Sequence, residues 1–222
     1  MDSPLPLAAY REISRRWPSA GRALLASWDA DTVVVYQAYR EDIARFALEH
    51  GRFGGAWSRT RMSWVKPGFL WMMYRSGWAT KPDQEVVLAV RVRRDFFDDV
   101  LARAVPTSFD GALYADHEAW QAAGRDADVR VQWDPDHDAA GRPLARRAIQ
   151  LGLREAALSR YADQAIVSIA DMSAVVAAGR GAASEALVVP DERPYPVAPD
   201  TRARLRIDAA TAEDADDRFT HT

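Results

Sequence analysis

Hydrophobic positions in the first part of the chain switch between the spacing of strands and that of helices. Residues 32–39, TVVVYQAY, are β-branched and aromatic, which predicts a buried strand. Residues 40–50 carry apolar side chains at helical spacing, and 61–65 read as a short strand. A further helix is expected to begin near Pro67 and to be capped by Gly77.

The rest of the chain continues this mixture of short elements. Strands are predicted at 85–94, 129–135, 145–153, 165–171 and 186–189, and helices at 96–105, 116–123, 154–161 and 172–180. Residues 4–28 are predicted to be helical, with an interruption at Pro18. Because regular βαβ spacing is absent, we expect an α+β fold with a mainly antiparallel or split sheet, in one domain over residues 1–207.

Composition narrows the class of protein. The 222 residues include no cysteine, which excludes disulfides, cysteine nucleophiles and thiolate metal sites. The net charge of −3 means that a nucleic-acid partner would need a local basic patch. No run of about 18 apolar residues occurs and the first residues lack the apolar core of a signal peptide, so we expect a cytoplasmic protein with no membrane contact. Residues 208–222 are acidic and rich in small side chains, which predicts a disordered tail.

Charge is distributed unevenly, and residues 50–82 contain no acid at all. With 32 acids in 222 residues, a window of 33 would hold about five by proportion. The same window holds six fixed positive charges, which include both lysines of the chain, Lys66 and Lys81. A positive field of this kind attracts an anion, and arginine and lysine suit phosphate. The alternative interpretation of these cations is an ordinary solvated face.

Aromatic side chains interleave with these charges. Flat rings beside cations suit a nucleobase, a nicotinamide or an adenine ring. The rings of the window are Phe53, Trp57, Trp64, Phe69, Trp71, Tyr74 and Trp78. We expect Phe69, Leu70 and Met73 to belong to the core. Trp71 and Trp78 fit a core or a ligand site equally well.

Other candidates lie outside this window. Tyr36, Gln37 and Tyr39 sit at the end of the predicted strand, a common place for ligand contacts. The cluster WDPDHD at 133–138 could hold a metal, but aspartates beside a proline are more often turn residues, so no metal is expected. The sequence contains no glycine-rich phosphate loop, HExxH or GxSxG motif.

Four segments, YQAY, the block from Arg61 to Lys81, VQWDP and AIQLGL, resemble the uncharacterised bacterial and fungal family called domain of unknown function 4291. The similarity runs from about Trp28 to Arg180. The family usually has Glu-Arg after VQWDP, whereas this chain has Asp-His, which argues against a fixed catalytic role for His137. Membership of this family implies no particular activity.

A weaker similarity links the order of elements to the ADP-ribosyltransferase fold. The strand ending in Tyr36-Gln37 resembles the start of its NAD site, RMSW resembles its second motif, and AIQLGL followed by AIVSI resembles its third-motif strand and the strand after it. This resemblance implies NAD as cofactor and places Gln150 where the usual glutamate stands. Glutamine cannot act as a base or stabilise an oxocarbenium-like transition state by charge. Either the chemistry differs, or another carboxylate serves, or the similarity does not extend to function.

These observations predict an ADP-ribosyltransferase-like enzyme that binds NAD through a basic and aromatic cleft and modifies a nucleic acid or nucleotide. One alternative is a non-catalytic nucleotide or single-stranded nucleic-acid binding module that uses the same cleft, and another is a tryptophan-rich core with incidental charge. The predicted catalytic residues are Gln150 and Tyr36. The predicted ligand-binding residues are Gln37, Tyr39, Arg61, Trp64, Lys66, Trp71, Tyr74, Arg75, Lys81 and Asp134.

Overall fold

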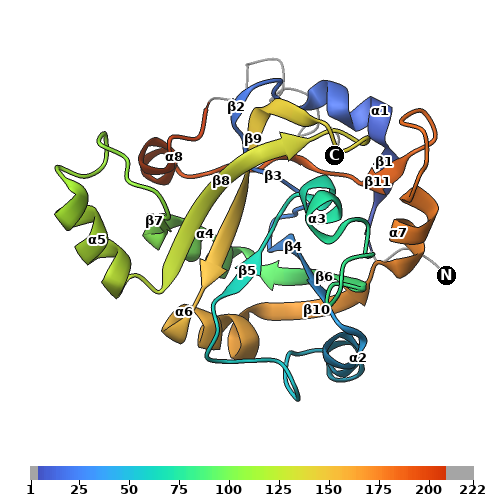
Figure 1. The fold of residues 1–222 in the computed structure, drawn as a ribbon, viewed down its shortest axis with the longest axis horizontal. Helices are drawn as coiled ribbons and strands as arrows, with labels where there is room; N and C mark the ends of the chain where they lie inside the picture. The colour runs from blue at the N-terminus through green and yellow to red at the C-terminus, as the bar shows by residue number, and fades with distance from the viewer. Residues whose placement is uncertain (1–4, 209–222) are drawn as a thin grey trace.

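Two largely antiparallel sheets form the framework of the computed structural model, which describes residues 5–208 (Figure 1). The first sheet has the order β10-β6-β4, with β4 at Thr32–Tyr39, β6 at Val86–Arg93 and β10 at Ile166–Asp171. In the second, β9 pairs with β8, β5 and β2, and β8 also pairs with β7. Its strands are β2 (Gly21–Arg22), β5 (Ser63–Val65), β7 (Val105–Pro106), β8 (Val129–His137) and β9 (Pro143–Leu153). The α+β architecture predicted from the pattern is confirmed.

A short bridge joins the two sheets. The amide of Tyr36 on β4 donates to the carbonyl of Lys66 over 2.6 Å, and the amide of Lys66 donates back over 3.2 Å. Beyond this point β4 and β5 separate, because β4 continues along β6 whereas β5 continues along β9. Gln37 and Tyr39, which follow the bridge on β4, and Ser63 and Trp64, which precede it on β5, line the gap where the sheets separate.

Helices and two-stranded ribbons surround these sheets. The helices are α1 (Tyr10–Ile13), α2 (Glu41–His50), α3 (Phe69–Ser76), α4 (Arg94–Arg103), α5 (His117–Asp126), α6 (Glu155–Arg160), α7 (Ser173–Gly179) and α8 (Pro199–Leu205), with a 3₁₀ turn at Ser14–Arg16 and a π turn at Tyr161–Ala165. The ribbons are β1 (Leu7–Ala9) with β11 (Val188–Pro190), and β3 (Leu25–Ala26) with β12 (Arg193–Pro194). Within the described residues, no helix is long and apolar enough to cross a membrane.

Strand β4 separates two hydrophobic cores. Val33 and Val35 point into one core, whereas Val34 and Tyr36 point into the other, because successive side chains of a strand face opposite ways. All four are at most 1% exposed. Burial on both faces explains why this strand reads as a continuous apolar run rather than an alternating one.

Helix α3 fills the second core and presents one edge to the gap between the sheets. Phe69, Leu70 and Met73 are buried, as predicted. Gly77 ends the helix at φ 60°, a left-handed conformation that glycine adopts without the clash of a side chain. The predicted start near Pro67 and the predicted cap at Gly77 are both confirmed.

Most predicted elements occur close to their expected positions, but two predictions are wrong. Residues 4–28 are not a broken helix: only 10–16 are helical, and the remainder forms short strands that pair with distant segments. Strand β8 does not end at Pro135 but continues to His137 through an irregularity in its pairing with β9. The predicted tail lies almost wholly outside the described residues.

Candidate functional site: a basic and aromatic cleft

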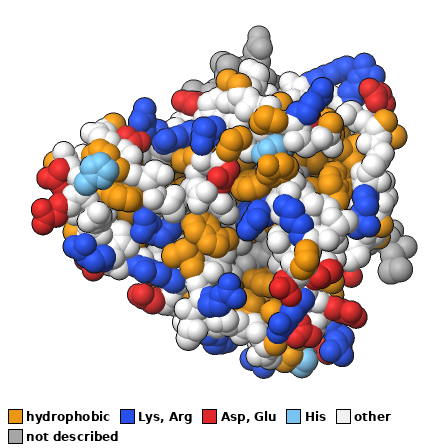
Figure 2. Space-filling view, in the orientation of Figure 1, with side chains coloured by type: hydrophobic (Ala, Val, Ile, Leu, Met, Phe, Trp, Pro, Cys, Tyr) orange, Lys and Arg blue, Asp and Glu red, His pale blue; other side chains and the backbone are white. Residues whose placement is uncertain are grey.

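A cleft of about 920 Å³ opens where the two sheets diverge. Its walls come from the ends of β4 and β5, from the exposed edge of α3, and from β8 and β9. Basic and hydrophobic side chains lie side by side over this part of the face shown in Figure 2. The volume falls near the upper end of the range of roughly 300–1,000 Å³ that is usual for small-molecule sites.

Lys66 is the most unusual cation of the cleft. Its side chain lines the cleft although the residue is only 5% exposed. Within residues 5–208 its ammonium group has no hydrogen-bond or ion-pair partner, although Asp134 and Arg75 are near enough to affect it. Burial, followed by repulsion from Arg75, lowers the pKa of Lys66 to about 8, while Asp134 opposes the shift. A buried charge without a partner is costly unless a ligand supplies one.

Two arginines extend this positive surface. Arg61 and Arg75 line the cleft, and no side-chain hydrogen bond or ion pair holds either of them within the described part of the chain. Arg59, which was part of the same basic window, is instead paired with Asp163 over 2.7 and 2.9 Å. The absence of acids along residues 50–82 therefore leaves Arg61, Lys66 and Arg75 unpaired, but it does not keep a distant acid from Arg59.

A carboxylate faces these cations. Asp134 on β8 lines the cleft, and both of its oxygens accept hydrogen bonds from glutamines. Gln132 donates to Oδ1 over 2.8 Å, and Gln150 donates to Oδ2 over 2.8 Å. Gln132 and Gln150 are directly opposite each other in the pairing of β8 with β9, so their amides reach the same neighbour.

A network of neutral groups closes the inner end of the cleft. The amide nitrogen of Gln37 donates to Ser63 Oγ and to the hydroxyl of Tyr39, each over 2.8 Å. Its carbonyl oxygen accepts from the hydroxyl of Tyr161 over 2.7 Å, and the indole of Trp57 donates to Tyr39 over 2.9 Å. Because partners on several elements fix both ends of the amide, Gln37 is held in one orientation.

Aromatic rings form two walls. Trp64 on β5 crosses Gly152 on β9, where a side chain would meet the ring at 3.0 Å, so this glycine makes room for the indole. On α3, Tyr74 is 47% exposed and stacks on His137, with ring centroids 3.4 Å apart. Trp71 is buried beside them, and its indole nitrogen has no hydrogen-bond partner within the described residues.

All but one of the predicted site residues line this cleft. The cleft holds Gln37, Tyr39, Arg61, Trp64, Lys66, Trp71, Tyr74, Arg75, Lys81, Asp134 and Gln150. The exception is Tyr36, which is fully buried in the second core against Phe69. Burial raises the pKa of Tyr36 well above its usual range, and the nearby Glu192 carboxyl adds to the shift. Strand alternation turns Tyr36 away from the face that Gln37 occupies, so its predicted catalytic contact is corrected to a core role.

Lys81 has a contact that its sequence position did not reveal. Its ammonium donates to the carbonyl of Arg75 over 2.8 Å and lies 5.9 Å from the centre of the Tyr74 ring. A cation at this place complements the negative end of α3. Lys81 therefore fixes the end of the helix that carries Tyr74 and Arg75.

Among the cleft residues that were not predicted as site residues, Trp57, Ser63 and Gln132 take part in the hydrogen bonds described above. Gln132 could have been found, because it lies two positions before Asp134 on one strand and so shares its face. Ser63 belongs to the RMSW segment, which was singled out as a motif without selecting the serine. The hydrogen bond from Trp57 to Tyr39 depends on a loop path that no periodicity specifies.

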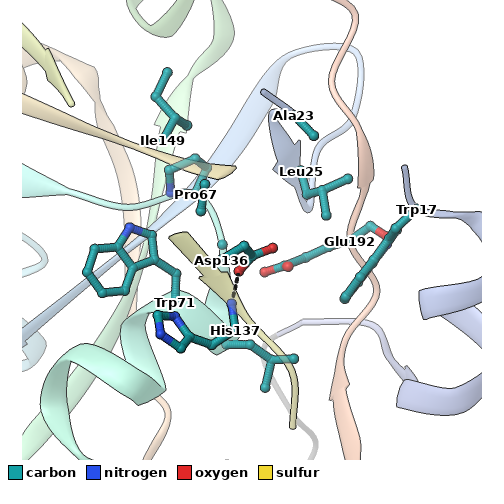
Figure 3. Close-up of a pocket in the computed structure, with 12 residues that line it drawn as sticks. Trp17, Ala23, Leu25, Pro67, Trp71, Asp136, His137, Ile149 and Glu192 are labelled. Carbon is teal, nitrogen blue, oxygen red and sulfur yellow. Dashed lines mark hydrogen bonds between the residues drawn. The ribbon is translucent and has the colours of Figure 1, made fainter. Parts of the chain in front are cut away.

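A second, much smaller cavity lies behind Trp71. It measures about 20 Å³, and the carboxyl groups of Asp136 and Glu192 point toward each other across it (Figure 3). Asp136 is neutralised by Arg146, with contacts of 2.6 and 2.7 Å. Glu192 accepts the amide of Phe69 at the start of α3 over 2.7 Å, and burial raises its pKa well above the usual range. This cavity has space for about one water molecule.

The acidic and histidine side chains of residues 133–138 do not share one site. Asp134 faces the large cleft, Asp136 is in the buried ion pair, and His137 stacks on Tyr74. Within residues 5–208, no group of three or more acidic or histidine side chains is arranged to hold a metal ion. The cleft can therefore offer cations for an anion, rings for a flat group, and one carboxylate between two amides.

The chain belongs to the family described as a domain of unknown function (DUF4291), whose model matches residues 23–195. The matched segment includes every residue that lines the large cleft. No curated protein is similar enough to this sequence to be matched.

Proposed function

We propose that this chain is an ADP-ribosyltransferase-like enzyme that binds NAD in the cleft between its sheets and acts on a nucleic acid or nucleotide. The observation that supports this most is the ammonium of the buried Lys66, which has no partner among residues 5–208 and lies in a cleft with two arginines that are likewise unpaired there, aromatic faces and a carboxylate. An anionic ligand with a flat ring satisfies all of these groups at once.

The arrangement of strands adds support. The three segments that resemble ADP-ribosyltransferase motifs lie on β4, β5 and β9, and each contributes side chains to the same cleft. In the proposed complex, Arg61, Lys66 and Arg75 bind the diphosphate, since guanidinium and ammonium groups suit phosphate oxygens. Trp64 and Tyr74 offer the ring faces. A cleft of about 920 Å³ has room for a dinucleotide.

One observation favours a second candidate, a binding module without catalysis. Gln37 and Gln150, which stand on the first and third motif strands, are both neutral amides. A neutral pair can position a nucleotide or single-stranded nucleic acid without promoting bond cleavage. This alternative uses the same cations and rings and differs only in the fate of the bound ligand.

Ligand binding can be followed by the fluorescence of the cleft tryptophans. The wild-type chain is titrated with NAD and with ADP-ribose, alongside K66A, R75A and the control R52A. Arg52 is exposed and lies outside the cleft. We expect K66A and R75A to weaken binding at least tenfold and R52A to leave it unchanged. Equal affinities in all four proteins would refute the assignment of the cleft.

The two candidate functions are separated by the products. Wild-type protein is incubated with NAD, with and without DNA or RNA oligonucleotides, and released nicotinamide is quantified. Release that increases with an oligonucleotide, together with a mass increase of the oligonucleotide, supports transfer. Salt-sensitive oligonucleotide binding without nicotinamide release would instead favour the binding module.

A further inference from the structure

We infer that Asp134 is the catalytic carboxylate of this cleft and takes the role that Gln150 cannot fill. This inference rests on the proposed function and assigns the group that stabilises its transition state. The third-motif strand is β9, whereas Asp134 lies on the adjacent strand β8. The required charge would thus come from the neighbouring strand.

Gln150 and Gln132 fix the orientation of this carboxylate, and we call this pair of donors the amide holder. Each oxygen of Asp134 accepts one amide hydrogen bond of 2.8 Å, so the carboxyl group cannot rotate without losing both. A carboxylate has about four acceptor positions, so further lone pairs stay available to a ligand. Both amide donors are neutral, so they leave the charge of the carboxylate uncancelled.

Comparison with Asp136 shows what is special about Asp134. Asp136 lies two residues further along the strand and is neutralised by Arg146 at 2.6 Å. Within the described residues, Asp134 has no ion pair within 4.0 Å, although Lys66 is near enough for each to influence the other. The cation and the carboxylate are therefore held apart across the cleft, which leaves both available to a bound molecule.

The only other carboxylate lining the cleft, within residues 5–208, is Asp83. Asp83 is exposed and sits in a turn after α3 at φ 63°. Exposure to water weakens its electrostatic effect on a bound cation. Asp83 therefore lacks both the amide holder and the partial burial of Asp134.

The chemical step is a substitution at the ribose carbon of NAD that is bonded to nicotinamide. The carbon–nitrogen bond breaks, and both electrons leave with nicotinamide, which departs neutral. Positive charge develops on the ribose, and the carboxylate of Asp134 stabilises it. A hydroxyl or amine of the nucleic acid then forms the new bond to the same carbon, and its proton passes to Asp134 and on to water.

The deciding experiment compares nicotinamide release and ADP-ribose binding in wild-type protein, D134N and D126N. Asparagine preserves size and hydrogen bonding, because a glutamine amide can turn to match it. We expect D134N to bind ADP-ribose within threefold of wild type and to release nicotinamide at least 100-fold more slowly. D126N should match wild type in both measurements, because Asp126 is exposed and lies outside the cleft.

Three outcomes separate the inference from the function on which it rests. If D134N retains release within threefold of wild type, Asp134 is not catalytic although the enzyme is active. If wild-type protein binds ADP-ribose but releases no nicotinamide with any acceptor, the catalytic assignment fails while the binding site stands. If wild-type protein binds neither NAD nor ADP-ribose, the proposed function fails and this inference fails with it.

Gln150 is a positioning residue, and its variants provide a second test that does not depend on D134N folding. In Q150A the hold on Oδ2 is lost, so we expect kcat to fall about tenfold with little change in KM. In Q150E a second carboxylate would lie against Asp134 and favour protonation of one of the two. The activity of Q150E should therefore shift to higher pH, a change that a merely structural role of Gln150 would not produce.

Discussion

At the scale of single residues, Lys66 is the clearest example of a side chain that lowers the stability of the fold. An amine that is 5% exposed and has no hydrogen-bond or ion-pair partner within residues 5–208 loses hydration, and the attraction of Asp134 offsets only part of this loss. Its pKa of about 8 lies below the ordinary value of 10.5 for the same reason. Groups of this kind occur where binding needs them, because a stable fold alone would favour an apolar side chain.

This reasoning predicts that K66M stabilises the protein at neutral pH. The folded-state pKa of Lys66 is depressed, so the unfolded chain binds more protons between about pH 8 and 10.5. Wild-type stability should therefore rise relative to K66M across this window, by roughly 3 kcal/mol in total. Urea unfolding of both proteins at pH 7 and pH 10 measures the difference. A K66M protein that is less stable than wild type at pH 7 would contradict this account.

Neighbouring residues can also differ completely in role, as Tyr36 and Gln37 show. Both were predicted at the site, but strand alternation sends Tyr36 into the core and Gln37 into the cleft. The sequence pattern could not show which of the two faces the cleft, because β4 is buried on both faces and lacks an alternation of polar and apolar residues. The block from Arg61 to Arg75 was easier to interpret, because charge and aromatic content are properties of composition rather than of direction.

At the scale of elements, helix α3 connects the small buried cavity to the large cleft. Its first amide is held by Glu192, whereas its last turn carries Tyr74 and Arg75 into the cleft. The ionisation state of the Glu192 carboxyl affects its interaction with α3, because a negative charge at the start of a helix interacts favourably with the helix dipole. The buried acid and these cleft residues thus contact opposite ends of one short helix.

We predict opposite effects for two substitutions of Glu192. E192Q keeps an oxygen that accepts the Phe69 amide but cannot ionise, whereas E192A loses the acceptor and should cost about 1–3 kcal/mol. Because the folded-state pKa of Glu192 is raised, wild type binds extra protons when folded and loses stability as pH rises above about 4.5.

E192Q lacks this loss, so its stability relative to wild type should increase with pH. Thermal unfolding of the three proteins at pH 4, 5.5 and 7 is the measurement. A constant difference between E192Q and wild type over this range would show that Glu192 keeps the same protonation state in the folded and unfolded chain.

The contact between β5 and β9 leads to another prediction. A methyl group at Gly152 would meet Met62 Sδ at 2.6 Å and the Trp64 ring at 3.0 Å. We expect G152A to displace Trp64, to destabilise the fold by about 1–3 kcal/mol and to weaken ADP-ribose binding. G141A is the control, because a side chain there meets nothing within 4 Å, although its positive φ of 76° adds some strain. If G152A binds ADP-ribose like wild type, the ring of Trp64 is not a ligand contact.

At the scale of the whole molecule, the sequence pattern predicted the elements that depend on local contacts and missed those that depend on pairing with distant segments. Strand β4, helix α2 and helix α3 were predicted well, because their own periodicity and caps define them. Residues 4–28 were not, because their short strands exist only through pairing with β9, β11 and β12. A segment whose partners lie far along the chain carries little evidence of its conformation.

The cleft belongs to this larger scale as well. The predicted site residues were identified from their chemistry, but their convergence on one cleft depends on β5 pairing with β9 while β4 pairs with β6. No local pattern specifies that choice. The holder around Asp134 likewise required the register that sets Gln132 opposite Gln150.

The pairing of β1 with β11 has a consequence for how the protein is made. Leu7 lies opposite Pro190, and the Trp17 indole donates to the carbonyl of Glu192 over 2.8 Å. During synthesis on the ribosome, the first strand must wait for nearly the whole chain to emerge before its partner exists. Until then the backbone donors and acceptors of β1 lack their strand partners, and an unpaired strand edge favours aggregation of the nascent chain.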